Sequence, residues 1–522
     1  MNRETLARLG PPSLAAATAI VAAGFLGSRL LGVVRSVVIA DTFGTSPELS
    51  AYLVAFRLPD LIFQLLAGAT LGAAFIPTFA RLFTKQSEEA AWRLASSVLN
   101  LVALATIAFA VLGFLLAPVL VPLMAPGLDE KGLAVDLTRL MMLSPILFAV
   151  SGMFMATLNA RHHFLFPAIA PIVYNLSIIA GAFFFDDVHA LAVAVVIGAA
   201  LHLVVQLPAL VAVGMRYQPI ARWRDASVRE VGRLMAPRVL GLAALQFNFL
   251  ITIFFASRVS DEAIAGVNYA YLLMMAPLGV FAMAISTAVF PTMAEQAADD
   301  RGQLRRTLET SLRMILFLTI PSAVGLMILS RPLVVFVLQR GAFTEASTDI
   351  TQAALLFYAI GLFAHAAIEI LSRGFYVLSD TRTPVVFAVV AVVANLILSA
   401  VLVGPLEVRG LALAVSLSAI LNAALLFWTL RARLEGFDLA ALGRSVGRTL
   451  LASVVMAEVV GFYLVLLHQA GHLDTGRLLD AFLALAGGGL LGTFIFLAAS
   501  RALRSEEVET LLRRVPWLSR SV

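Results

Sequence analysis

Long apolar stretches follow one another along the chain, separated by short segments that hold glycine, proline and most of the charge. A helix that crosses a bilayer needs about 20 largely apolar residues, and these stretches reach that length. The pattern therefore predicts an all-α, polytopic membrane protein with about 14 transmembrane helices. The expected spans are 13–41, 50–83, 93–124, 133–160, 164–185, 189–215, 230–258, 263–295, 305–339, 349–374, 382–404, 409–433, 444–468 and 477–503.

Part of the sequence occurs twice. The segment 74–80 (AFIPTFA) matches 288–294 (VFPTMA after Ala288), an offset of about 214 residues that later drifts to about 220 and relates Asn175 to Asn395. Six helices per copy would give two lobes of the same orientation, related by a pseudo-two-fold axis along the membrane normal. We predict an N-terminal lobe at 1–215, a C-terminal lobe at 216–434, and two further helices with a cytoplasmic tail at 435–522.

Composition supports the membrane interpretation. Of 522 residues, 61% are hydrophobic and 13% charged, whereas soluble domains are about 45–50% apolar. Lysine and arginine gather in alternate loops, which predicts a multi-pass protein of the plasma membrane with both termini cytoplasmic. The net charge of +5 does not indicate nucleic-acid binding, because no basic tract interleaved with aromatics is present. Without cysteine, disulfides and thiolate metal sites are excluded.

Three arginines lie inside predicted spans: Arg29 and Arg35 in the first, and Arg57 in the second. An arginine at mid-membrane costs about 2.5–3.5 kcal/mol even on lenient scales, and guanidinium groups bind phosphate through two parallel hydrogen bonds. We therefore expect these residues to line a wet cavity and bind an anion, with Asp41 and Asp60 in supporting roles. The alternative left open is that Arg57 pairs with Asp60 and Arg35 reaches the outer headgroups.

Other polar residues within spans point less clearly to function. His365, Glu369 and Arg373 share one helix face, where a local ion pair is favoured over a proton or cation relay. Asn395 fits an interhelical hydrogen bond better than a sodium site, and Glu458 either faces a groove or is neutral. No P-loop, zinc or nucleophile motif occurs. We expect a transporter with no cofactor, coupled to a monovalent cation, the membrane potential or the substrate gradient.

Several short motifs resemble one known family. The segments 27–35 (GSRLLGVVR), 40–44 (ADTFG), 54–59 (VAFRLP), 74–77 (AFIP) and 339–344 (QRGAFT) are similar to MurJ (MviN-type) lipid II flippases of the MOP exporter superfamily. The resemblance implies alternating-access transport of the undecaprenyl-diphosphate-linked peptidoglycan precursor from the inner to the outer leaflet. It also implies that Arg29, Arg35 and Arg57 engage the diphosphate and sugars, and that the last two helices accept the polyprenyl tail. We expect a monomer among membrane lipids.

The chain departs from the family pattern at three informative positions. Ser36 and Ser50 stand where acidic residues are usual, and Leu272 stands where the eighth span usually has an arginine. Either another residue supplies that charge, or the chain carries another polyprenyl-diphosphate-linked glycan. A non-transporting scaffold for cell-wall enzymes is a third hypothesis, and it predicts that Arg29→Ala leaves function intact.

Overall fold

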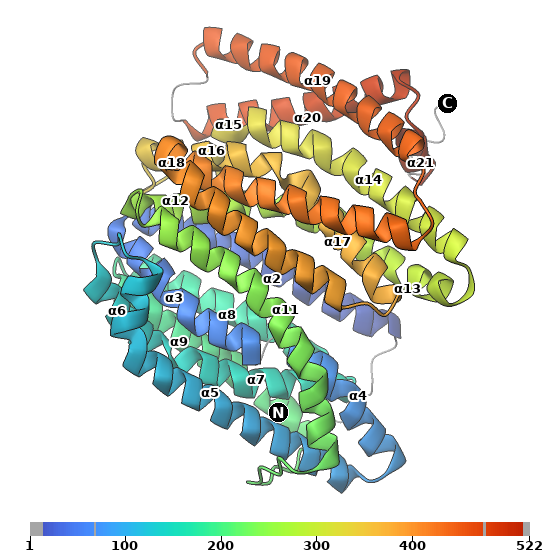
Figure 1. Ribbon diagram of the computed structural model, residues 1–522. Coiled ribbons are helices and arrows are strands. Elements are labelled where there is room, and N and C mark those ends of the chain that lie inside the picture. The colour runs from blue at the N-terminus through green and yellow to red at the C-terminus, as the bar shows by residue number, and fades with distance from the viewer. Residues whose placement is uncertain (1–13, 67–68, 473–476, 515–522) are drawn as a thin grey trace. The chain divides into compact units, whose positions relative to one another are not determined.

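The computed structural model describes residues 14–66, 69–472 and 477–514, and every regular element in these ranges is a helix (Figure 1). The first half contains α2 (Leu14–Phe43), α3 (Pro47–Leu66), α4 (Ala69–Lys85), α5 (Glu88–Met124), α6 (Lys131–Met141), α7 (Leu143–Ala160), α8 (Leu165–Phe184), α9 (Val188–Val204), α10 (Leu207–Ala212) and α11 (Ala226–Ala256). It is followed by α12 (Asp261–Pro277), the π-helix η1 (Leu278–Met283), α13 (Ala284–Asp299), α14 (Arg301–Ile328), α15 (Ser330–Leu338), α16 (Glu345–Ile360), α17 (Leu362–Val377), α18 (Arg382–Arg433), α19 (Leu439–Gln469), α20 (Leu478–Ala502) and α21 (Glu506–Arg514).

The chain forms two compact units, Met1–Asp261 and Glu262–Val522. In the first unit α11 packs against α3, α4 and α5, and α8 packs between α2 and α9. In the second unit α14 contacts α17 and α19, and α19 pairs with α20. The lobe boundaries drawn from the sequence repeat remain a prediction.

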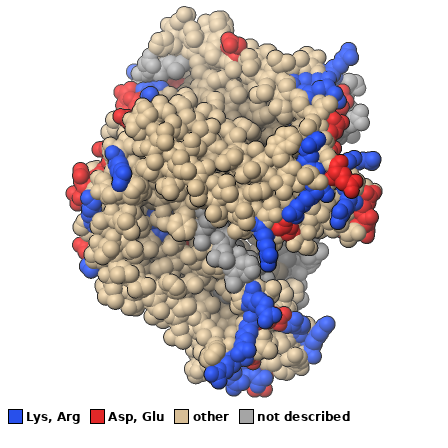
Figure 2. Space-filling view, viewed as in Figure 1, with Lys and Arg blue, Asp and Glu red and all other residues tan. Residues whose placement is uncertain are grey.

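Eleven of the described helices are long and apolar enough to cross a membrane, and the bent pair α16–α17 makes a twelfth if it counts as one span. Two features account for the difference from the fourteen expected. Residue Glu407 has non-helical backbone angles inside α18, so this 52-residue element is two helices, as the predicted spans 382–404 and 409–433 require. The apolar end of α11, Gln246–Ala256, is short by itself. The chain is a multi-pass membrane protein, and in Figure 2 charged side chains gather near the margins of a broad uncharged face.

The second predicted span differs from the structure, because 50–83 contains two helices, α3 and α4. The turn inside α18 is tight: a Cβ on Gly410 would lie 2.2 Å from the carbonyl oxygen of Leu402, so only glycine fits there. Hydropathy alone locates apolar residues but does not show where the backbone changes direction.

The internal repeat is visible in the order of the helices. Helices α6 and α16 begin 214 residues apart, at Lys131 and Glu345, whereas the helices that follow them begin 219 residues apart, at Leu143 and Leu362. The first pair also differs in length, with 11 residues in α6 and 16 in α16. The five additional residues of α16 therefore explain most of the drift in the sequence offset.

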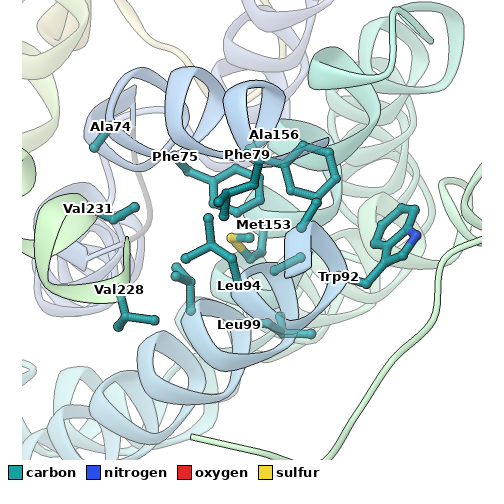
Figure 3. Close-up of a cluster of buried hydrophobic side chains, with 14 residues drawn as sticks. Ala74, Phe75, Phe79, Trp92, Leu94, Leu99, Met153, Ala156, Val228 and Val231 are labelled. Atoms are coloured by element: carbon teal, nitrogen blue, oxygen red, sulfur yellow. The ribbon is translucent and has the colours of Figure 1, made fainter. Parts of the chain in front are cut away.

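A cluster of buried hydrophobic side chains joins four helices of the first unit (Figure 3). Phe79 of α4 meets Trp92 of α5 edge to face, with ring centroids 5.4 Å apart, and Met153 of α7 and Val231 of α11 complete the contact. Arg81 and Glu230 form an ion pair between α4 and α11. This packing fixes α4, α7 and α11, three of the helices that surround or support the site described next.

Candidate functional site

A cavity of about 630 Å³ lies inside the first unit. It is enclosed by α2, α3, α4, α7, α8 and α9, so segments more than 150 residues apart in the sequence contribute to its wall. The lining is aromatic and apolar with several polar groups, namely Arg35, Phe56, Pro59, Asp60, Phe63, Gln64, Gly72, Ser144, Phe148, Gly152, Met155, Ala156, Asn159, Pro171, Tyr174 and His202.

Arg35 is the positively charged residue of this lining. It lies about two turns before the end of α2, and its charge acts on the buried phenols of Tyr52 and Tyr174. Among the described residues, its guanidinium has no hydrogen-bond acceptor and no carboxylate partner. A guanidinium placed in this way presents its fork of N–H donors to the cavity, which is the geometry that binds a phosphate or carboxylate.

Asp60 is the carboxylate of the same lining, and amide groups hold it in place. Gln246 of α11 donates to it from Nε2 at 3.3 Å, and Gln64 approaches it at 3.5 Å. Arg57 lies outside the lining: its guanidinium carbon is 4.8 Å from the centre of the Phe249 ring on α11, and its charge acts on Asp60. Two contacts therefore connect this part of α3 to α11.

A buried polar network behind the cavity was not anticipated from the sequence. The Oγ of Ser151 lies 2.6 Å from Nδ1 of His202, and Gln206 donates from Nε2 to the same oxygen at 2.6 Å. Gln206 also donates to the carbonyl oxygen of His202 at 2.9 Å, and the Phe148 ring packs edge to face on the imidazole. These contacts fix the ring of His202 at the cavity wall. The signal available in the sequence was the i, i+4 spacing of His202 and Gln206.

The other predicted site residues lie elsewhere. Arg29 is exposed, with its guanidinium carbon 4.7 Å from the centre of the Phe25 ring. Six residues separate it from Arg35, which is about 120° around a helix, so the two side chains leave α2 in different directions. Asp41 is exposed near the end of α2. Asn395 is buried in α18 of the second unit, where it accepts a hydrogen bond from Ser399 at 3.2 Å. The cavity thus brings together Arg35 and Asp60, and the roles of all the predicted residues in substrate binding remain predictions.

The polar series on α17 forms the local ion pair that the sequence favoured. Arg373 bonds to Glu369 at 3.2 Å and donates to Thr287 at 3.2 Å. Leu272 lies partly buried on α12. Within the described ranges, no group of three or more histidine, aspartate or glutamate side chains is arranged to hold a metal ion.

The comparisons with known proteins agree with one another. The family model "Lipid II flippase MurJ" matches residues 39–477. The lipid II flippase MurJ of Burkholderia cenocepacia is 32% identical over 79% of this chain and 83% of its own length. The probable lipid II flippase MurJ of Thermotoga maritima is 31% identical over 94% of this chain and 97% of its own length.

Solved structures show the same relationship. A lipid II flippase MurJ in an inward closed conformation superimposes with a TM-score of 0.76 and 25% identity, covering 92% of this chain and 97% of the other. A multidrug resistance transporter of the MATE family in the MOP superfamily, in an inward-facing conformation, gives 0.63 at 14% identity over 83% of this chain and 97% of its own, which shows the shared fold. Together with the family model, these matches show that the chain belongs to the lipid II flippase MurJ family, whose members are transporters rather than enzymes.

Proposed function

We propose that the chain moves lipid II, the undecaprenyl-diphosphate-linked peptidoglycan precursor, from the inner to the outer leaflet of the plasma membrane by alternating access. The observation that carries the proposal beyond family membership is Arg35, a guanidinium without a carboxylate partner among the described residues that lines an internal cavity. The diphosphate is the part of the substrate least able to enter hydrocarbon, so it is the part that a transporter must bind inside the membrane.

The remaining lining suits the polar headgroup that surrounds the diphosphate. Gln64, Ser144, Asn159 and Tyr174 offer amide and hydroxyl groups to sugar hydroxyls, and aromatic rings provide flat apolar surfaces. Arg29 and Arg57 would contribute further positive charge along the path, as the family resemblance implies. Asp60 reduces the net charge of the cavity, which limits how tightly an anion is held.

The membrane potential is the simplest driving force for this proposal. Both termini would face the cytoplasm, as the loop charges predict, and the anionic headgroup would leave the negative side of the membrane. Moving one elementary charge through 100 mV releases about 2.3 kcal/mol, so a doubly charged diphosphate gains about twice that amount. Coupling to a monovalent cation is the alternative.

Complementation of a bacterium depleted of its own lipid II flippase tests the proposal. The wild-type chain should restore growth, and Arg35→Ala should lose that rescue while accumulating to the same level in the membrane. Arg93→Ala is the matched control, because Arg93 is a half-exposed arginine paired with Glu89 on the surface of α5. In spheroplasts, an enzyme that degrades lipid II only from outside should find less substrate with Arg35→Ala than with Arg93→Ala. Equal rescue by both variants would contradict the role of Arg35.

A flippase for another polyprenyl-diphosphate-linked glycan is the second candidate, and Leu272 favours it because this position usually carries an arginine in the family. The two proposals differ in one result. If the wild-type chain reaches the membrane of the depleted strain but neither restores growth nor exposes lipid II, then the substrate carries a different glycan.

A further inference from the structure

Glu458 lies at the middle of the membrane-spanning helix α19. Ten residues separate it from Arg448 toward one end and ten from His468 toward the other. At about 1.5 Å per residue, each of these polar residues is roughly 15 Å away along the axis. Because the hydrocarbon core is about 30 Å thick, this carboxyl group lies close to the bilayer centre.

The side chain of Glu458 points away from the rest of its unit. Helix α19 packs on α14 and α20 through Ala452, Met456 and Val460, which are buried, whereas Glu458 is exposed. It forms no hydrogen bond or ion pair with any residue in the described part of the chain. An acidic side chain at this depth costs about 2.5–3.5 kcal/mol on insertion scales, and hydrocarbon chains offer it no hydrogen bond.

Glu458 is the central member of a row of exposed positions along α19. Leu451, Val454, Glu458, Gly461 and Val465 follow steps of three, four, three and four residues. The three aliphatic members are 59%, 56% and 51% exposed, and no atom lies within 4 Å of the place where a Cβ on Gly461 would be. Steps of three and four describe the seam along which two helices pack in a left-handed coiled coil. The open glycine one turn from Glu458 lets a second backbone come close.

We propose that this seam is the interface at which α19 pairs with α19 of a second copy of the chain. Copies of one membrane protein have the same orientation, so the two helices run parallel and each seam residue faces its counterpart across a two-fold axis. Glu458 would then meet Glu458. A carboxyl group that carries its proton is both donor and acceptor, so it is complementary to itself, and one polar residue in an apolar seam fixes the register. The protein is then a dimer in the membrane, in place of the monomer expected from the sequence.

Disulfide trapping in native membranes tests this proposal, because the chain contains no cysteine and each introduced thiol is unique. Val454→Cys and Val465→Cys place thiols on the seam on both sides of Glu458. Phe494→Cys is the control, since Phe494 is 69% exposed on the neighbouring helix α20. After mild oxidation, the two seam variants should give a disulfide-linked dimer on a non-reducing gel, and the control should stay monomeric.

Substitution of Glu458 separates a specific pair from random collision. In the Val454→Cys background, Glu458→Leu should lower dimer formation roughly tenfold, the scale expected for a hydrogen bond between membrane helices. Glu458→Gln should preserve it, because an amide is also self-complementary. Equal membrane levels and thermal stability of the variants exclude misfolding. The proposal is overturned by equal cross-linking at Phe494→Cys, by no effect of Glu458→Leu, or by a seam that cross-links only to a different protein.

Discussion

Glu507 ties the C-terminal helix α21 to the second unit, and its removal should release that helix. The carboxylate is 5% exposed and accepts hydrogen bonds from Arg313 Nε at 2.7 Å, Ser445 at 2.8 Å and Ser505 at 2.7 Å. Breaking a buried ion pair by removing one partner costs about 3–5 kcal/mol. Arg313 is 20% exposed and keeps its contact with Glu506, so we expect Glu507→Ala to cost about 3 kcal/mol, the lower end of that range.

Local opening of α21 can be measured directly through the next residue. Val508 is 1% exposed within a cluster that includes Phe317 and Phe496, so a thiol in Val508→Cys reacts with a maleimide only when α21 leaves its place. Since every 1.4 kcal/mol is tenfold, Glu507→Ala should raise the labelling rate about a hundredfold over Val508→Cys alone.

Glu506→Ala is the matched control for this experiment. Glu506 also bonds to Arg313, at 2.6 Å, but it is 73% exposed. Exposed ion pairs contribute about 1 kcal/mol or less, so this variant should raise labelling at most about fivefold. Equal rates for Glu506→Ala and Glu507→Ala, or a rate for Glu507→Ala that matches its parent, would refute the assignment of the tie to the buried carboxylate.

Three further predictions concern other parts of the fold. Burial raises the pKa of Asp380, but hydrogen bonds from Thr383 and the charge of Arg433 outweigh it and lower the pKa to about 2; this stabilisation is present above the ordinary aspartate pKa and should be lost as pH falls toward 2, so the melting temperature of the wild type should drop over that interval while Asp380→Asn shows no such component. Gly127→Ala should lower the melting temperature in detergent because its Cβ would lie 1.9 Å from the Ser257 carbonyl oxygen, whereas Gly132→Ala, which meets open space, should not. Phe79→Ala, at a fully buried position, should cost about 3–5 kcal/mol and lower the melting temperature further than either glycine variant.

Most of the fold was predictable because a bilayer imposes simple requirements on a chain. A run of about 20 apolar residues has few alternatives to a spanning helix, and the break between 404 and 409 was marked by Pro405 and nearby charged residues, as the backbone at Glu407 confirms. The π-helix at Leu278–Met283 and the division of 50–83 into two helices were not predicted. Both concern backbone hydrogen bonding inside apolar sequence, which hydropathy does not record.

The site was predictable only where a single residue carried its own signal. Arg35 and Asp60 stood out because charge is expensive inside a span, and both line the cavity. Gln246, which holds Asp60, is 186 residues away in the sequence. Such a residue has no local mark, since its role depends on how α11 packs against α3. His202 was overlooked for the same reason: its network with Ser151 depends on the pairing of α7 with α9.

The charges of the two units are arranged differently, and this difference bears on how an anion can be carried. In the second unit, arginines that join helices are neutralised by carboxylates: Arg331 by Glu345 and Asp349, and Arg433 by Asp380. In the first unit, Arg35 faces a cavity with no such partner among the described residues. Attraction for a diphosphate therefore falls on the first unit, which agrees with an uncharged residue at position 272. A carrier must also release its substrate, and Asp60 in the same cavity offsets part of the attraction that Arg35 supplies.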